Sequence, residues 1–226
     1  MNTKIKLAIA LAGIFLFASC NNENTTADTV TTDSTNMSNM KMDTSHKKMN
    51  DKEMANPDNE LANTMKAMMD KMGNMKMTGD FDLDYANMMI GHHQGAIDMS
   101  NIELTKGADD KMKTMAKDII TKQTGDITML RQFVENYKPS GMKHGEGTLQ
   151  KMQADMKTGM KAMQMNGNTD KDFAAMMISH HEAGMKMSEA QVSNGMSEKL
   201  KDMAKKGISY ETKEIADFKK WLQGKH

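Results

Sequence analysis

Cysteine is almost absent from this 226-residue chain, because Cys20 is the only one. A single cysteine excludes a disulfide within the chain, a thiolate nucleophile in the folded part and a metal site built from cysteines. Both prolines, Pro57 and Pro139, lie at boundaries and never inside a periodic segment. Aromatic residues make up only 4% of the chain, and no segment alternates with a period of two. We therefore expect no β-sheet.

A charge excess is also absent, since 30 basic residues balance 30 acidic ones. Nothing in this balance resembles the basic footprint of a nucleic-acid-binding protein, so we expect no nucleic-acid partner. The dominant feature is methionine, which occurs 30 times. Methionine fills irregular gaps in protein cores but specifies packing poorly, and a soluble domain does not need so many.

The N-terminus predicts export. Residues 1–19 combine a positive start, Lys4 and Lys6, with an apolar stretch from Leu7 to Phe17, which is typical of a signal peptide. The following run, residues 17–20, resembles the lipobox of bacterial lipoproteins, in which the cysteine is lipidated. That resemblance implies a lipid on Cys20 and a protein anchored in the bacterial cell envelope, on the periplasmic or outer-membrane face. The alternative is an ordinary cleaved signal followed by an unmodified thiol.

A polar segment separates the anchor from the folded domain. Residues 20–58 are rich in Asn, Thr, Asp, Ser and Lys, and we expect them to form a disordered tether. This tether is unusual because it also contains several methionines, although it has no core to fill. We place the helical domain at residues 59–224.

The domain is an internal duplication. Shifting the sequence by 88 residues aligns residues 61–133 with 149–221 without a gap, and the run Met-Met-Ile-x-His-His at 88–93 falls on the same run at 176–181. The two repeats span about 59–137 and 147–224. Each repeat predicts three helices, at about 59–77, 82–107 and 109–137 in the first and at about 147–165, 170–195 and 197–223 in the second. The fold class expected is all-α, an antiparallel four-helix bundle with two extra Met-rich helices.

The His-His runs are the strongest functional signal. On a helix, neighbouring histidines point about 100° apart, whereas residues four apart share a face, so Met88 pairs with His92 and Met89 with His93. Thioether and imidazole donors suit Cu(I) and Ag(I). Because Met185 stands where the first repeat has Ile97, the second repeat is the richer site. The candidate metal ligands are His92, His93, His180, His181, Met88, Met89, Met99, Met176, Met177, Met185 and Met187.

Two other interpretations remain open. A methionine stripe at helical spacing and a histidine on an apolar face are common features of ordinary cores, so the chain could be a structural or interaction lipoprotein with no metal. For Met65, Met68 and Met72, core packing is the preferred interpretation. Enzymatic motifs are lacking, and we expect no catalysis; cuprous oxidation is the one redox activity to consider. No Glu-x-x-His motif occurs, which argues against di-iron carboxylate chemistry.

The repeated runs also resemble a known family. Residues 88–99 look like the signature of the DUF305 family, residues 116–123 resemble its third-helix pattern, and residues 176–187 repeat the signature. The resemblance implies a ferritin-like four-helix bundle in bacterial envelope proteins, with copper or silver binding in some members. It also implies that His92, His93, His180 and His181 are the motif histidines. The metal expected is copper as Cu(I), for sequestration or delivery.

Overall fold

Helices account for the regular structure of this chain. The computed structural model describes residues 59–139, 141, 145, 147–152, 154 and 165–224. The helices are α1 (Glu60–Gly73), α2 (Phe81–Lys106), α3 (Asp110–Asn136), α5 (Thr169–Asn194) and α6 (Glu198–Gln223). Residues 148–152 and 154 are also helical. These described ranges contain no strand, so the all-α prediction is confirmed. The predicted signal peptide, Cys20 and the tether lie outside the described residues.

Side-chain caps set where the helices begin. The carboxylate of Asp80 accepts a hydrogen bond from the backbone N–H of Leu83 and opens α2. Asn168, its counterpart 88 residues later, opens α5 in the same way. The long helices agree with their predicted bounds to within two residues, whereas α1 ends at Gly73, four residues early. The duplication is therefore as clear in the capping as in the sequence.

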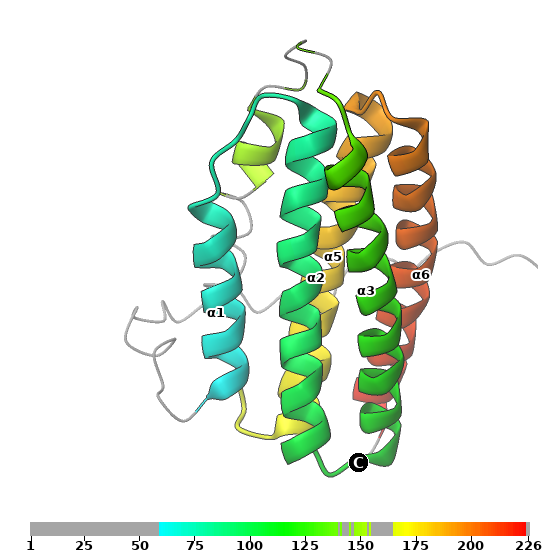
Figure 1. The fold of residues 1–226 in the computed structure, drawn as a ribbon. Helices are drawn as coiled ribbons and strands as arrows, with labels where there is room; N and C mark the ends of the chain where they lie inside the picture. The colour runs from blue at the N-terminus through cyan, green and yellow to red at the C-terminus, as the bar shows by residue number, and fades with distance from the viewer. Residues whose placement is uncertain are drawn as a thin grey trace, which may run out of the picture. The chain divides into compact units, whose positions relative to one another are not determined.

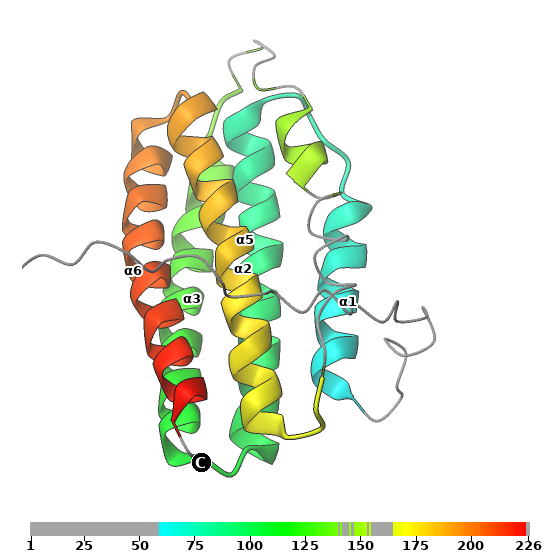
Figure 2. The ribbon, with the colours of Figure 1, turned by 180° about the vertical axis from the view of Figure 1, so that it is seen from behind.

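Two helical hairpins form the bundle (Figure 1). Helix α2 packs against α3, α5 packs against α6, and the hairpins join mainly through α2 and α5. Helix α1 lies against α2, on the side away from α3, as the view from behind also shows (Figure 2). The four long helices thus make one bundle, and α1 forms an extra wall beside it. Among the described residues, no helix is long and apolar enough to span a membrane.

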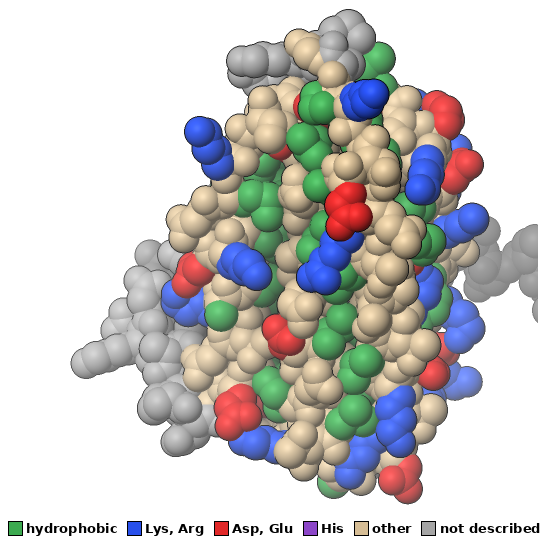
Figure 3. All heavy atoms as spheres, viewed as in Figure 1, with side chains coloured by type: hydrophobic (Ala, Val, Ile, Leu, Met, Phe, Trp, Pro, Cys, Tyr) green, Lys and Arg blue, Asp and Glu red, His purple; other side chains and the backbone are tan. Residues whose placement is uncertain are grey.

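Methionine fills much of the core. Several methionines rank among the largest fully buried side chains, namely Met72, Met88, Met99, Met112, Met176, Met177 and Met187. Three phenylalanines, Phe81, Phe173 and Phe218, join them. On the face drawn in Figure 3, lysines and acidic residues are interspersed and none of the described histidines is visible. Among the described residues, lysines lie at the surface, whereas many of the methionines and the four histidines of the His-His runs are buried.

Two aspartates cap the helices of the opposite repeat. Asp82 and Asp170 lie in the Asp-rich starts of α2 and α5, but the caps of these helices are Asp80 and Asn168. The carboxylate of Asp82 instead accepts hydrogen bonds from the backbone N–H groups of Met196 and Ser197, at 3.0 and 2.9 Å, where α6 begins. Asp170 does the same for Ala108 and Asp109, at 2.9 and 2.8 Å, where α3 begins. These exchanged caps fasten the two repeats together.

The exchanged caps are not chemically equal. Beside Asp82, the side-chain amide of Gln191 donates a hydrogen bond of 2.6 Å. At the matching position beside Asp170 stands Glu103, a buried acid. Burial, reinforced by the nearby Asp170 carboxylate, raises the pKa of Glu103 to about 8. The first repeat therefore keeps a proton on the carboxyl group of Glu103, at the position where the second repeat has the side-chain amide of Gln191.

Replacing Glu103 by Gln should stabilise the protein in a pH-dependent way. Between pH 4.5 and about 8 the folded chain holds a proton on Glu103 that the unfolded chain has released, so wild-type stability falls as pH rises through this window. In Glu103→Gln that loss disappears. We expect its free energy of unfolding to exceed that of the wild type by ~1–3 kcal/mol at pH 9 and to match it near pH 4. Urea unfolding at both pH values measures this, and an equal difference at both would contradict the account.

Candidate metal-binding site

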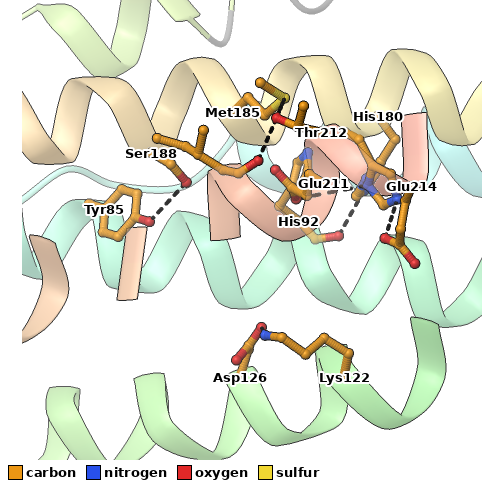
Figure 4. Close-up of polar contacts among 12 residues, drawn as sticks. Tyr85, His92, Lys122, Asp126, His180, Met185, Ser188, Glu211, Thr212 and Glu214 are labelled. Carbon is orange, nitrogen blue, oxygen red and sulfur yellow. Dashed lines mark hydrogen bonds and ion pairs between the residues drawn. The ribbon is translucent and has the colours of Figure 1, made fainter. Parts of the chain in front are cut away.

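Two histidines from different repeats meet at the centre of the bundle. His92 on α2 and His180 on α5 are equivalent under the 88-residue shift, and both are buried. Their ring centroids lie 3.6 Å apart, with 30° between the ring planes. The Nε2 atom of His180 lies 3.0 Å from the backbone oxygen of His92 (Figure 4). The sequence suggested one histidine site per repeat, whereas the structure brings these two rings together.

A cavity of about 560 Å³ adjoins this pair of rings. His92 and His180 line it together with thioethers from α1 and from the helical stretch that follows residue 147. Within the described part of the chain, the methionines that line it are Met65, Met68, Met69 and Met152. Exposed side chains of α5, including Glu182, Lys186 and Glu189, line it as well. The cavity therefore combines soft sulfur and nitrogen donors inside with charged groups toward solvent.

One glycine allows α1 to approach this cavity closely. A Cβ atom at Gly95 would lie 2.3 Å from the sulfur of Met68, which no real side chain tolerates. The second repeat has Ala183 at the equivalent position. Gly95 thus lets α1 bring its methionines against α2 in the first repeat.

The second repeat moves its glycine by one position and opens a different space. Gly184 stands where the first repeat has Ala96. A Cβ atom at 184 would lie 2.7 Å from Oε1 of Glu211 and 3.0 Å from Cε1 of His92. This glycine therefore faces the interior of the bundle, where it leaves room for Glu211 beside His92.

Burial keeps the central imidazoles uncharged. It lowers the pKa of His92 and of His180 well below the ordinary 6.5, and neighbouring histidines lower both further. Burial, followed by the nearby Lys122 ammonium, also lowers the pKa of His93 to about 3. Near neutral pH each of these rings thus keeps a nitrogen lone pair.

The second histidine of each run points away from the first, as the helix geometry predicts. The ring centroids of His92 and His93 are 6.3 Å apart, and those of His180 and His181 are 5.9 Å apart. His181 lies between two buried acids of α6. Its Nε2 is 2.9 Å from Oε2 of Glu214, and its Nδ1 is 3.8 Å from Oε1 of Glu211.

This acidic pair has no equal in the first repeat. Gln123 stands at the position equivalent to Glu211, and Asp126, equivalent to Glu214, forms an ion pair with Lys122. Burial, and then the charge of Glu214, raises the pKa of Glu211 well above its ordinary value. The second histidines of the two runs therefore have different surroundings, with buried acids beside His181 only.

The structure divides the predicted ligands among three places. His92 and His180 line the cavity, and His93 and His181 face other parts of the interior. Most of the predicted methionines belong to the hydrophobic core, namely Met88, Met89, Met99, Met176, Met177 and Met187. Met185 is partly exposed, and its sulfur lies 3.8 Å from Oγ1 of Thr212, whose hydroxyl donates to the backbone oxygen of Ile208.

Sequence reasoning did not select the methionines that line the cavity. The prediction that Met65, Met68 and Met72 pack in the core is confirmed, since all three belong to it, whereas Met69 and Met152 were not singled out. The periodic stripe on α1 showed that one face is buried, but not that this face meets the two central histidines. Within the described ranges, moreover, no group of three or more His, Cys, Asp and Glu residues is placed to hold a metal ion.

The chain belongs to the family described as a domain of unknown function, DUF305, whose pattern matches residues 17–134 and 82–222. Among solved structures, it is similar to CopM in the Cu(II)-bound form, at 27% identity, covering 63% of this chain and 95% of that chain with a TM-score of 0.49. It is similar to CopM in the Ag-bound form at 24% identity, covering 66% and 97% with a TM-score of 0.49.

A third similar structure is a putative secreted DUF305 protein from Streptomyces coelicolor. The identity is 18%, the match covers 66% of this chain and 99% of that one, and the TM-score is 0.51. This likeness shows the shared helical fold. No curated protein matches the chain.

Proposed function

We propose that this protein binds soft monovalent metal ions, Cu(I) or Ag(I), as cargo in the cavity between α1 and the central histidines. The observation that carries the proposal is the convergence of two buried imidazoles and four thioethers on one space of about 560 Å³. Thioether and neutral imidazole donors together select soft ions over Mg²⁺ or Ca²⁺, which prefer oxygen. The role is binding, for sequestration or delivery, rather than catalysis.

The donors fit such an ion without prior deprotonation. Thioethers carry no proton, and the pKa values of His92 and His180 are lowered, so both rings are neutral near pH 7. Thioethers also form no disulfides, which suits an oxidising compartment. The carboxylates of Glu182 and Glu189, exposed on α5 beside the cavity, can attract cations toward it.

We also propose that the chain works at the envelope, attached to the membrane through a lipid on Cys20. The support is the sequence of residues 1–20, with its positive start, apolar stretch and cysteine at the expected cleavage point. In the sequence, the methionines and His46 of residues 37–54 belong to the segment that joins this anchor to the bundle, and we propose that they pass ions to the cavity. Mass spectrometry of Cys20 from native membranes tests the anchor, and an unmodified thiol would contradict it.

Replacing the three cavity methionines of α1 by Leu tests the binding proposal. Leu has nearly the same volume as Met but no sulfur, so Met65→Leu, Met68→Leu and Met69→Leu together should cost at most a few kcal/mol of stability. We expect the affinity for Ag(I) to fall about a hundredfold, or ~2.7 kcal/mol. Affinity is measured by competition with a chelator, using the full chain with Cys20→Ser so that no thiol binds silver.

Two exposed methionines provide the matched control. Met129 and Met196 are 41% and 52% exposed and do not line the cavity. The double variant Met129→Leu, Met196→Leu should keep wild-type affinity. If both variants bind Ag(I) as the wild type does, the cavity is not the site. The structural alternative, a Met-filled core with no metal, predicts instead that the wild type itself has no affinity for Ag(I).

A further inference from the structure

We infer that His180 binds the metal ion through its Nδ1 atom, with its Nε2 committed to the backbone carbonyl of His92. This inference rests on the proposed function and specifies how that site is built. It specifies which ring nitrogen of His180 faces the ion, and therefore how this ligand on α5 is oriented.

The hydrogen bond to His92 determines the proton position on His180. Nε2 of His180 lies 3.0 Å from the backbone oxygen of His92, and both residues are buried. A carbonyl oxygen can only accept, so Nε2 must carry the hydrogen. A neutral imidazole has one N–H, and its other nitrogen, Nδ1, then holds the lone pair that a metal requires.

The remaining nitrogen of His180 is available to a ligand. Nδ1 of His180 is buried and has no hydrogen-bond partner within the described residues. His180 also lines the cavity that receives the thioethers of α1. A buried polar atom without a partner is costly, and a metal ion from the cavity would satisfy it.

Binding through Nε2 would need a rearrangement. The ring would have to give up its hydrogen bond to His92, and the proton would have to move to Nδ1. Metal-bound histidines in proteins usually donate their second ring nitrogen to a carbonyl or carboxylate, which fixes the tautomer and the ring orientation. Here the orienting group belongs to α2 while the ring belongs to α5, so the bond also ties the donor across the interface of the repeats.

His92 is held less firmly than His180. Its ring nitrogens form no hydrogen bond of good geometry with the described residues, although the backbone of His180 lies close enough to raise the pKa of its ring against the effect of burial. The nitrogen that faces the ion is therefore assigned for His180 alone, where the bond of 3.0 Å is formed.

Nitrogen NMR of the imidazoles tests this assignment. The full chain with Cys20→Ser is labelled with ¹⁵N, and long-range proton–nitrogen correlations are recorded before and after addition of one equivalent of Ag(I). Signals are assigned with the single variants His180→Gln and His93→Gln. The free protein should show a lone-pair shift at Nδ1 of His180 and a protonated shift at Nε2. Ag(I) should displace the Nδ1 signal and leave Nε2 protonated.

The outcomes separate this inference from the proposed function. If Ag(I) displaces the Nε2 signal of His180 instead, or leaves both of its nitrogens unchanged while shifting His92, the inference is wrong and metal binding stands. If Ag(I) shifts no signal of His92 or His180, the cavity does not bind it and the proposed function fails. Displacement at Nδ1 in the wild type, reduced in the triple Met→Leu variant of α1, supports both.

Discussion

A chain in which His92 and His180 are both replaced by Gln is expected to bind Ag(I) at least about a thousandfold more weakly than the wild type, ~4 kcal/mol. Gln supplies no nitrogen lone pair, so both imidazole donors of the cavity are lost. The amide N–H of Gln at position 180 can still approach the His92-position carbonyl, which limits the loss of stability. Chelator competition measures affinity, and thermal unfolding without metal measures stability.

The other two histidines of the same runs provide the control. In His93→Gln, His181→Gln the cavity keeps both of its imidazoles, since His93 and His181 do not line it. Silver affinity should change by less than about threefold, within ~0.7 kcal/mol. Stability should fall, because His181 contacts the buried Glu211 and Glu214. Equal loss of affinity in both double variants would contradict a site centred on the cavity.

The second prediction with a large effect concerns the stability of the protein at acid pH. Burial and the charge of Lys122 lower the pKa of His93 to about 3 from an ordinary 6.5. Between these pH values the unfolded chain holds a proton on this ring that the folded chain excludes, so acid favours unfolding. Protonation of His93 in the unfolded chain should therefore by itself lower the free energy of unfolding by about 1.4 kcal/mol for each pH unit below 6.5.

The single variant His93→Gln isolates this contribution. Its free energy of unfolding should fall less steeply with decreasing pH than that of the wild type, by the equivalent of one proton. The advantage gained between pH 6 and pH 4 should amount to ~2–3 kcal/mol. Urea unfolding across that range measures the slope. A constant difference between the two proteins at every pH would show a packing effect instead.

Much of the fold follows from the sequence because its signals are local or repeated. Helical periodicity and the 88-residue register placed the long helices to within two residues. Gly107 and Gly195 end α2 and α5 as expected. The divergence of neighbouring histidines follows from helix geometry alone. The family resemblance, carried by the two His-His runs, is confirmed over most of the chain.

The site was harder to predict because it depends on which helix faces which. The stripe containing Met65 and Met68 predicts a buried face equally well for a core and for a cavity wall. Only the close approach of α1 at Gly95 brings these sulfurs near the histidines. The exchanged caps of Asp82 and Asp170 escaped prediction for the same reason, since their partners lie in the other repeat.

The burial of Glu211 on α6 could have been predicted from the helical spacing of its neighbours. Glu211 lies three residues after Ile208 and four before Ile215, so it occupies a position of the apolar stripe. Glutamate is usually exposed at the protein surface, so the residue type alone gave no reason to expect that Glu211 is buried. The equivalence of Glu211 with Gln123 in the first repeat shows that this position takes a polar side chain in both copies.

X-ray absorption at the copper edge tests the central claim most directly. The full chain with Cys20→Ser is loaded anaerobically with one equivalent of Cu(I), and the scattering atoms around copper are determined. We predict nitrogen and sulfur neighbours together in the wild type, and fewer sulfur neighbours in the variant with Met65, Met68 and Met69 replaced by Leu, which keeps Met152. An unchanged spectrum in that variant would contradict a metal site in the cavity beside His92 and His180.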